Sequence, residues 1–265
     1  MNYWTQSDKN IYVAAHRGAS TVYPENTMLA FRKAAEMGVD QIETDVHVTK
    51  DGYLVLIHDD TVDRTTNGKG NVYDYTLEEL RALDAGSWKG EQFAGQQIPL
   101  LSEFLELVKE MNVKTIDIEL KEYPLRGRDE IAYEVCDKTI AMIEEYGLGE
   151  RCVINSFNSK LHEHIQRKYG NRYRQHVYFP NEYNFYGSVD PYSYAYCCCM
   201  FGKNGDMATV EEYEAMRALG VRTWAGASVK DEATVQGAIE RGAELITCNN
   251  PDEVLRILRE KGYHD

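Results

Sequence analysis

The sequence predicts an α/β protein folded as a (β/α)8 TIM barrel. Two observations support this: short apolar runs rich in β-branched and aromatic residues, and amphipathic segments of helical length that alternate with them along the chain. Alternation of this kind is typical of parallel strands joined by helices, and eight such units close into a barrel. An open, doubly wound sheet is the alternative architecture.

The expected strands and helices follow one another in a regular order. We expect strands at residues 11–15, 39–47, 114–120, 151–156, 174–179, 194–200, 221–226 and 243–248, and a short return strand at 53–57. We expect helices at residues 26–37, 102–111, 129–146, 159–169, 210–219, 231–241 and 251–261. Residues 180–192, between the fifth and sixth strands, are rich in aromatic side chains and could shape a pocket or an interface.

The sequence also predicts helix boundaries and one long insertion. Asn26 is a candidate N-cap, and Gly38 and Gly220 suit helix ends. Residues 59–100 are rich in Gly, Asp and Thr, contain one short expected helix at 77–83, and follow the second strand. We interpret them as an insertion over the barrel mouth, within a single domain that spans residues 1–265.

Composition limits the partners of the chain. Its 43 acidic and 29 basic residues give a formal net charge of -14, which argues against nucleic acid or an anionic membrane surface as the main partner. Neither a secretory signal nor an apolar run of about 18 residues is found, so we expect no integral membrane association. The oligomeric state stays open.

The six cysteines do not form the spacing of a disulfide framework or a zinc site. Three are consecutive, at Cys197, Cys198 and Cys199, and neighbouring residues in a strand point to opposite faces. Reduced, buried thiols in a cytoplasmic protein are the better interpretation. A reactive cysteine is the less favoured alternative.

Glu43, Asp45 and His58 are expected to converge on one hairpin. Residues 39–49 alternate like a strand, and Asp51-Gly52 is typical of a two-residue hairpin loop. With that loop Asp45 lies opposite His58, with Cβ atoms ~5 Å apart, and Glu43 shares their face. Taken alone, the three residues could also be a salt-bridged surface hairpin.

Charged residues end two further strands. His16 and Arg17 follow the first expected strand, and Glu119 and Lys121 end the third. Barrel enzymes keep their chemistry at the carboxyl ends of the strands, so these groups are expected at one rim. Singly, His16 could be a core histidine and Glu119 with Lys121 an internal ion pair.

The residue types at this rim suit phosphodiester chemistry. Three carboxylates, from Glu43, Asp45 and Glu119, are hard oxygen ligands suited to Mg²⁺ or Ca²⁺. Arg17 and Lys121 can donate to the same phosphate. Two histidines can divide the proton transfers, one taking a hydroxyl proton and the other protonating the leaving alkoxide.

The motifs resemble the glycerophosphodiester phosphodiesterase family in order and spacing, most specifically in the first 120 residues. The matching segments are His16-Arg17-Gly18, Pro24-Glu25-Asn26-Thr27, Ile42-Glu43-x-Asp45-Val46, Thr49-x-Asp51-Gly52, His58-Asp59, Arg64-Thr65-Thr66, Ile118-Glu119-x-Lys121 and Ser156-Phe157. The resemblance implies a (β/α)8 barrel with a small insertion after strand two. It also implies hydrolysis of a small-molecule glycerophosphodiester to glycerol 3-phosphate and an alcohol.

The resemblance also assigns roles. It implies that His16 and His58 are the general acid/base pair, Glu43, Asp45 and Glu119 the ligands of a divalent cation, and Arg17 and Lys121 the phosphate-binding groups. In the family scheme a glycerol hydroxyl attacks phosphorus to give a cyclic phosphate, which water then opens. Trp224 could cover the glycerol moiety, or it could be a packing residue at the barrel rim.

The C-terminal part departs from the family pattern. Trp224-Ala225-Gly226-Ala227 stands where Trp-Thr-Val-Asn is typical, and Cys248-Asn249-Asn250-Pro251 stands where Thr-Asp-x-Pro is common. Substrate identity is therefore less securely predicted than reaction type. Two alternatives are a lyase that releases the cyclic phosphate and a non-catalytic binder of phosphorylated metabolites. The presence of both histidines disfavours a binder.

Overall fold

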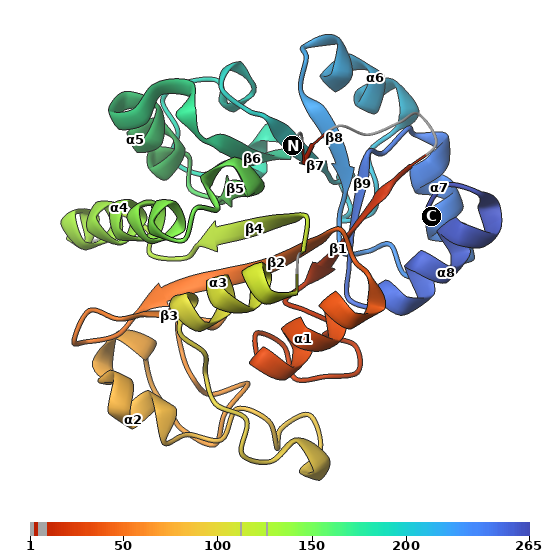
Figure 1. The fold of residues 1–265 in the computed structure, drawn as a ribbon. Coiled ribbons are helices and arrows are strands. Elements are labelled where there is room, and N and C mark those ends of the chain that lie inside the picture. The colour runs from red at the N-terminus through yellow and green to blue at the C-terminus, as the bar shows by residue number, and fades with distance from the viewer. Residues whose placement is uncertain (1–2, 5–9, 112, 126) are drawn as a thin grey trace.

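The computed structural model describes residues 3–4, 10–111, 113–125 and 127–265, and its centre is a closed barrel of parallel strands (Figure 1). The barrel strands are β1 (Tyr12–His16), β2 (Gln41–Val48), β4 (Thr115–Leu120), β5 (Cys152–Asn155), β6 (Arg174–Phe179), β7 (Cys197–Met200), β8 (Arg222–Ala225) and β9 (Leu245–Cys248). Strand β1 pairs in parallel with both β2 and β9, which closes the sheet. The (β/α)8 barrel is confirmed, and the open sheet is excluded.

Helices surround the barrel (Figure 1), and each packs buried apolar side chains against it. They are α1 (Met28–Met37), α3 (Leu101–Glu110), α4 (Asp129–Glu145), α5 (Ser159–Tyr169), α6 (Val210–Ala218), α7 (Glu232–Glu240) and α8 (Pro251–Lys261). Phe31 of α1 packs on Phe104 of α3 with ring centroids 4.7 Å apart, and both are fully buried. The apolar side chains of these helices and the outward-facing strand residues form the main core.

The hairpin loop after β2 is one residue longer than predicted, and this changes the pairing of its two strands. Strand β3 (Leu54–Leu56) pairs with β2 so that Val46 lies opposite Leu56. The loop has three residues, 50–52, because Thr49 N–H donates to Tyr53 O at 2.9 Å. A three-residue loop with glycine in the left-handed region is a common hairpin, and Gly52 has φ +87°. The predicted pairing of Asp45 with His58 is therefore wrong: Ile57 N–H donates to Asp45 O.

Residues 59–100 project from the barrel after β3 and carry the short helix α2 (Leu77–Arg81) (Figure 1). They have a small apolar cluster of their own, built on the outer face of β3. Its buried members are Val55, Ile57, Val62, Val72, Leu80, Ala85 and Ile98. After β6 the described chain forms two 3-10 turns, Asn181–Tyr183 and Pro191–Ser193, in place of an α-helix.

The turn between β1 and α1 contains three residues with positive φ: Arg17, Gly18 and Asn26. Thr27, not the predicted Asn26, is the N-cap of α1, since its hydroxyl accepts from Ala30 N–H. Asn26 has φ +53° and turns its buried side chain toward β2 instead. Gly18 has φ +80°, and a Cβ there would lie 2.6 Å from the carbonyl carbon of Ala30. The helix can approach the end of β1 only because residue 18 is glycine.

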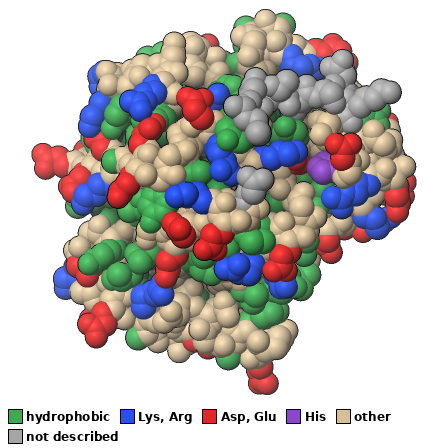
Figure 2. Space-filling model, viewed as in Figure 1, with side chains coloured by type: hydrophobic (Ala, Val, Ile, Leu, Met, Phe, Trp, Pro, Cys, Tyr) green, Lys and Arg blue, Asp and Glu red, His purple; other side chains and the backbone are tan. Residues whose placement is uncertain are grey.

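Acidic and basic side chains are interspersed over the face shown in Figure 2.

The expected helix end at Gly38 is confirmed, with φ +85° and bonds to two carbonyls of the last turn. All six cysteines are buried and unpaired, as the sequence predicted. Among the described residues, no helix has both the length and the apolar character needed to cross a bilayer.

Candidate active site

Parallel register brings the strand-end residues of β1, β2 and β4 together. His16 is the register partner of Glu43, and Asp45 is that of Glu119. Partners in adjacent strands project to the same side of the sheet. Four side chains from three strands that are far apart in the sequence therefore meet at one mouth of the barrel.

Glu43, Asp45 and Glu119 form a compact carboxylate cluster. One ligand atom from each lies within 4.8 Å of the others, and all three residues are buried. Burial raises the pKa of Glu43 well above its usual range, and the charge of Asp45 adds to this effect. Glu43 Oε1 is buried without a hydrogen-bond partner. Buried, closely spaced carboxylates with free oxygen lone pairs match the donor set that Mg²⁺ or Ca²⁺ prefers.

Lys121 and Arg17 contact the same cluster. Lys121 Nζ donates to Glu119 Oε1 at 2.6 Å and lies 3.1 Å from Asp45 Oδ1. Burial opposes the charge of Asp45, but the positive charges of Lys121 and Arg17 outweigh it and lower the Asp45 pKa. Arg17 has φ +59°, and its backbone N–H donates to Glu43 Oε2 at 2.9 Å. Two positively charged side chains, Lys121 and Arg17, thus lie beside the three carboxylates.

The two histidines present equivalent nitrogens to this mouth of the barrel. His16 Nδ1 lies 2.7 Å from Asn249 Oδ1, and His58 Nδ1 lies 2.6 Å from Asp59 Oδ1. Because both partner oxygens are acceptors, each Nδ1 carries the proton and each Nε2 is left for chemistry. Burial lowers the pKa of both rings, that of His16 to about 4.

An ion-pair network that the sequence pattern did not predict connects Arg17 to Asp59, the partner of His58. Arg64, from the 59–100 insertion, donates to both oxygens of Glu25 at 2.8 Å and to Asp59 Oδ2 at 2.7 Å. Glu25 also accepts from Arg17 Nη1 at 3.0 Å. The network therefore links His58, through Asp59 and Arg64, to Arg17. The motif match included Glu25 and Arg64, but their spacing gave no sign that they meet.

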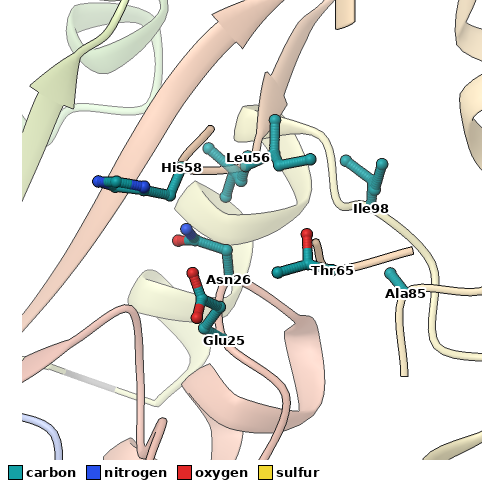
Figure 3. A pocket seen from close by; sticks show the side chains of 8 residues that line it. Glu25, Asn26, Leu56, His58, Thr65, Ala85 and Ile98 are labelled. Carbon is teal, nitrogen blue, oxygen red and sulfur yellow. The ribbon is translucent and has the colours of Figure 1, made fainter. Parts of the chain in front are cut away.

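Figure 3 shows Glu25 and Asn26 beside His58, across a small cavity from Thr65, Ala85 and Ile98. Asn26 Nδ2 donates to Asp45 Oδ2 at 2.8 Å, and Asn26 Oδ1 accepts from Thr44. This cavity measures about 10 Å³, roughly enough for one water molecule. A ligand larger than water would not fit in it.

A larger cavity of about 210 Å³ opens directly on the histidines and carboxylates. Its lining residues come from the ends of seven barrel strands and from the loops that follow them. They are His16, Arg17, Glu43, His58, Asp117, Glu119, Asn155, Phe157, His176, Tyr178, Cys199, Phe201, Gly226, Ala227 and Thr247. Trp224 is absent from this lining: it is 2% exposed and packs edge-on against His176 with centroids 4.9 Å apart.

Comparisons with known proteins agree with this arrangement. Residues 16–253 match the model of the "Glycerophosphoryl diester phosphodiesterase family". The chain is 37% identical to a glycerophosphodiester phosphodiesterase of Caldanaerobacter subterraneus, over 94% of this chain and 98% of that one.

Two solved structures share the fold. A glycerophosphodiester phosphodiesterase from Agrobacterium tumefaciens superposes with a TM-score of 0.75 at 25% identity, covering 92% of this chain and 98% of that chain. An Oleispira antarctica phosphodiesterase, solved with the product sn-glycerol-3-phosphate, gives a TM-score of 0.79 at 24% identity over 94% of this chain and 96% of that chain.

Proposed function

Because the chain belongs to the glycerophosphoryl diester phosphodiesterase family, and is thus a phosphoric diester hydrolase, we propose how its residues carry out that activity. The substrate is a small glycerophosphodiester, and the products are glycerol 3-phosphate and an alcohol. The observation that supports this most strongly is that both histidines, Glu43 and Glu119 line one cavity of about 210 Å³, with the buried Asp45 clustered against the two glutamates.

Glu43, Asp45 and Glu119 would hold a divalent cation, Mg²⁺ or Ca²⁺. Bound there, the cation would neutralise charge on the phosphate oxygens. The unpartnered Oε1 of Glu43 and the spacing of the three carboxylates support this ligand set. Arg17 and Lys121 bind the remaining phosphate oxygens, and the ion pairs that hold them near the carboxylates keep them oriented.

His16 and His58 exchange protons with the substrate through their Nε2 atoms. The 2-hydroxyl of the glycerol moiety attacks phosphorus as one histidine takes its proton, and the P–O bond to the alcohol breaks as the other protonates the leaving oxygen. Water then opens the cyclic phosphate with the two roles reversed, which gives glycerol 3-phosphate. The acceptor oxygens that hold both Nδ1 atoms support this assignment.

Trp224 acts on the site indirectly in this proposal. Its buried ring supports His176, which lines the cavity.

We also propose a cytoplasmic location, supported by six buried and unpaired thiols, which suit a reducing compartment.

The test is an assay of the purified protein on a panel of glycerophosphodiesters with added Mg²⁺ or Ca²⁺, with the phosphorylated product identified. We expect glycerol 3-phosphate, and we expect His16→Ala and His58→Ala each to lower kcat by about 100-fold or more. His164→Ala, on the outer helix α5, is the matched control and should keep wild-type kcat. A stable cyclic phosphate as the sole product would indicate a lyase, and full activity in both active-site variants would refute the acid/base assignment.

A further inference from the structure

Asp117 and His176 form a buried pair inside the catalytic cavity that the proposed proton transfers do not use. His176 Nδ1 lies 2.7 Å from Asp117 Oδ2, and the two residues are 4% and 1% exposed. They come from different strands, β6 and β4, and both line the cavity. An ionisable pair buried this deeply is costly unless it has a binding partner or a structural role.

Both members of the pair keep one unsatisfied atom. Asp117 Oδ1 and His176 Nε2 are buried without a hydrogen-bond partner. Each unsatisfied atom costs free energy in the absence of a ligand, so a ligand that satisfies both gains affinity. The pair is therefore prepared to receive a small polar group.

The His176 ring is fixed in position from several sides. Asp117 holds its Nδ1, Trp224 packs edge-on at 4.9 Å, and Tyr178 lies at 5.1 Å. The Tyr178 hydroxyl in turn donates to Asn155 Oδ1 at 2.7 Å. A ring held this firmly loses little conformational entropy when it binds a ligand.

The pair lies at a distance from the carboxylate cluster that suits the substrate. Asp117 is two residues before Glu119 on β4 and shares its face, which places the two Cα atoms about 7 Å apart. Since Glu119 belongs to the carboxylate cluster where phosphate would bind, the other end of a three-carbon polyol can reach Asp117.

A hydroxyl is the group that satisfies the pair best. When His176 Nε2 carries a proton, one hydroxyl satisfies both atoms, because its O–H donates to Asp117 Oδ1 and its oxygen accepts from Nε2–H. The adjoining wall is aromatic: Phe157 stacks on Tyr178 at 3.6 Å, and Tyr178 stacks parallel to Phe201 at 5.8 Å. Such a wall suits the C–H faces of a short polyol whose hydroxyl points toward Asp117 and His176.

We propose that Asp117 and His176 bind the terminal hydroxyl of the glycerol moiety, the one that does not attack phosphorus, and so select substrates in which it is free. The inference rests on the proposed function and adds a specificity determinant to it. Substrates acylated at that hydroxyl, or lacking it, leave both buried atoms unsatisfied and are disfavoured.

The test compares two substrates that differ only at this hydroxyl. They are sn-glycero-3-phosphocholine and its analogue built on propane-1,2-diol, which keeps the attacking hydroxyl and lacks the terminal one. We expect the wild-type kcat/KM to favour the glycerol substrate by about 10- to 100-fold. Turnover of neither substrate would refute the proposed function, whereas equal turnover of both would refute this inference alone.

Variants of the pair then locate the source of the preference. His176→Phe keeps a ring against Trp224, and His176→Asn is a smaller second choice should the first not fold. Either should lower kcat/KM for the glycerol substrate by about 10-fold or more and leave the analogue within about 3-fold of wild type. His164→Ala, as a control outside the cavity, should keep the wild-type preference. Equal losses on both substrates, or an unchanged preference, would overturn the proposal.

Discussion

The two proposed catalytic histidines have partners of different charge: His16 contacts Asn249, and His58 contacts Asp59. His58 is held by a carboxylate, but His16 is held by a neutral amide oxygen. An amide orients the ring without stabilising its protonated form as a carboxylate would. Burial can therefore lower the pKa of His16 to about 4, so that the ring is neutral at pH 7.

Asn249→Asp should raise this pKa. A negative charge next to Nδ1 favours the protonated ring, and we expect an upward shift of about 1–2 units. The His16 imidazole would then titrate nearer its ordinary value of 6.5, and its neutral form would be lost at a higher pH than in the wild type. The measurement is an NMR titration of the metal-free protein. An unchanged His16 pKa would mean that the amide does not set the protonation state of the ring.

Arg64 is the second residue whose effect can be isolated. Arg64→Ala removes the bonds to Glu25 and Asp59, so His58 and Arg17 lose their shared support. We expect kcat/KM to fall by roughly 10- to 100-fold, the range for partners that orient site residues. Arg256→Ala is the matched control, since Arg256 also bridges two carboxylates, on the exposed face of α8.

Steady-state kinetics of both arginine variants decide the point. Thermal unfolding should change little in either, because both arginine side chains are exposed, at 43% and 51%, and an ion pair of an exposed arginine contributes at most ~1 kcal/mol. Equal kcat/KM in the two variants would show that Arg64 has no part in the site.

At the scale of elements, the sequence located strands well and loop geometry poorly. Apolar periodicity placed β1, β2 and β4 within two residues of their observed bounds, and strand ends carry His16 and Glu119. The hairpin loop could not be read in the same way, because Asp51-Gly52 fits both a two-residue loop and the end of the observed three-residue loop. Even so, closure of the barrel brings His58 to the cavity.

Contacts that depend on barrel closure had no signal in the sequence. Asp117 and His176 lie on strands that are not neighbours in the sheet, and they meet only across the barrel interior. Asn26 was expected to cap α1, a role that its side-chain chemistry allows, but it is used to hold Asp45. Local propensity cannot distinguish a cap from a tertiary contact when the same residue type serves both.

Gly18 tests the contact between the end of β1 and helix α1. In Gly18→Ala the new methyl group would lie 2.6 Å from the Ala30 carbonyl carbon, and φ is +80°. We expect a loss of roughly 2–4 kcal/mol in the free energy of unfolding, from overpacking plus backbone strain. Gly220→Ala is the control: its φ is +81°, but its Cβ position is open, so only about 1 kcal/mol of strain is expected. Denaturant unfolding compares the two, and equal losses would argue against the close approach.

For the whole molecule, we propose that residues 1–265 form one domain and that the 59–100 insertion folds with the barrel. Its apolar cluster is built on β3, and Arg64 bonds to Glu25. Denaturant unfolding followed by tryptophan fluorescence should coincide with that followed by circular dichroism, because Trp88 lies in the insertion and Trp4 and Trp224 lie at the barrel. Separate transitions would instead make the insertion an independent unit.

We propose above all that Glu43, Asp45 and Glu119 together bind one divalent cation at the mouth of the barrel. Calorimetric titration of the metal-free protein with Mg²⁺ or Ca²⁺ tests it most directly, in the wild type, in Asp45→Asn, and in Asp137→Asn as a control. Asp137 also lies near a cysteine and a histidine, but that group offers one carboxylate where Glu43, Asp45 and Glu119 offer three. We predict one ion per chain, lost in Asp45→Asn and kept in Asp137→Asn. An Asp45→Asn titration that matches the wild type would show that these three carboxylates do not form the cation site.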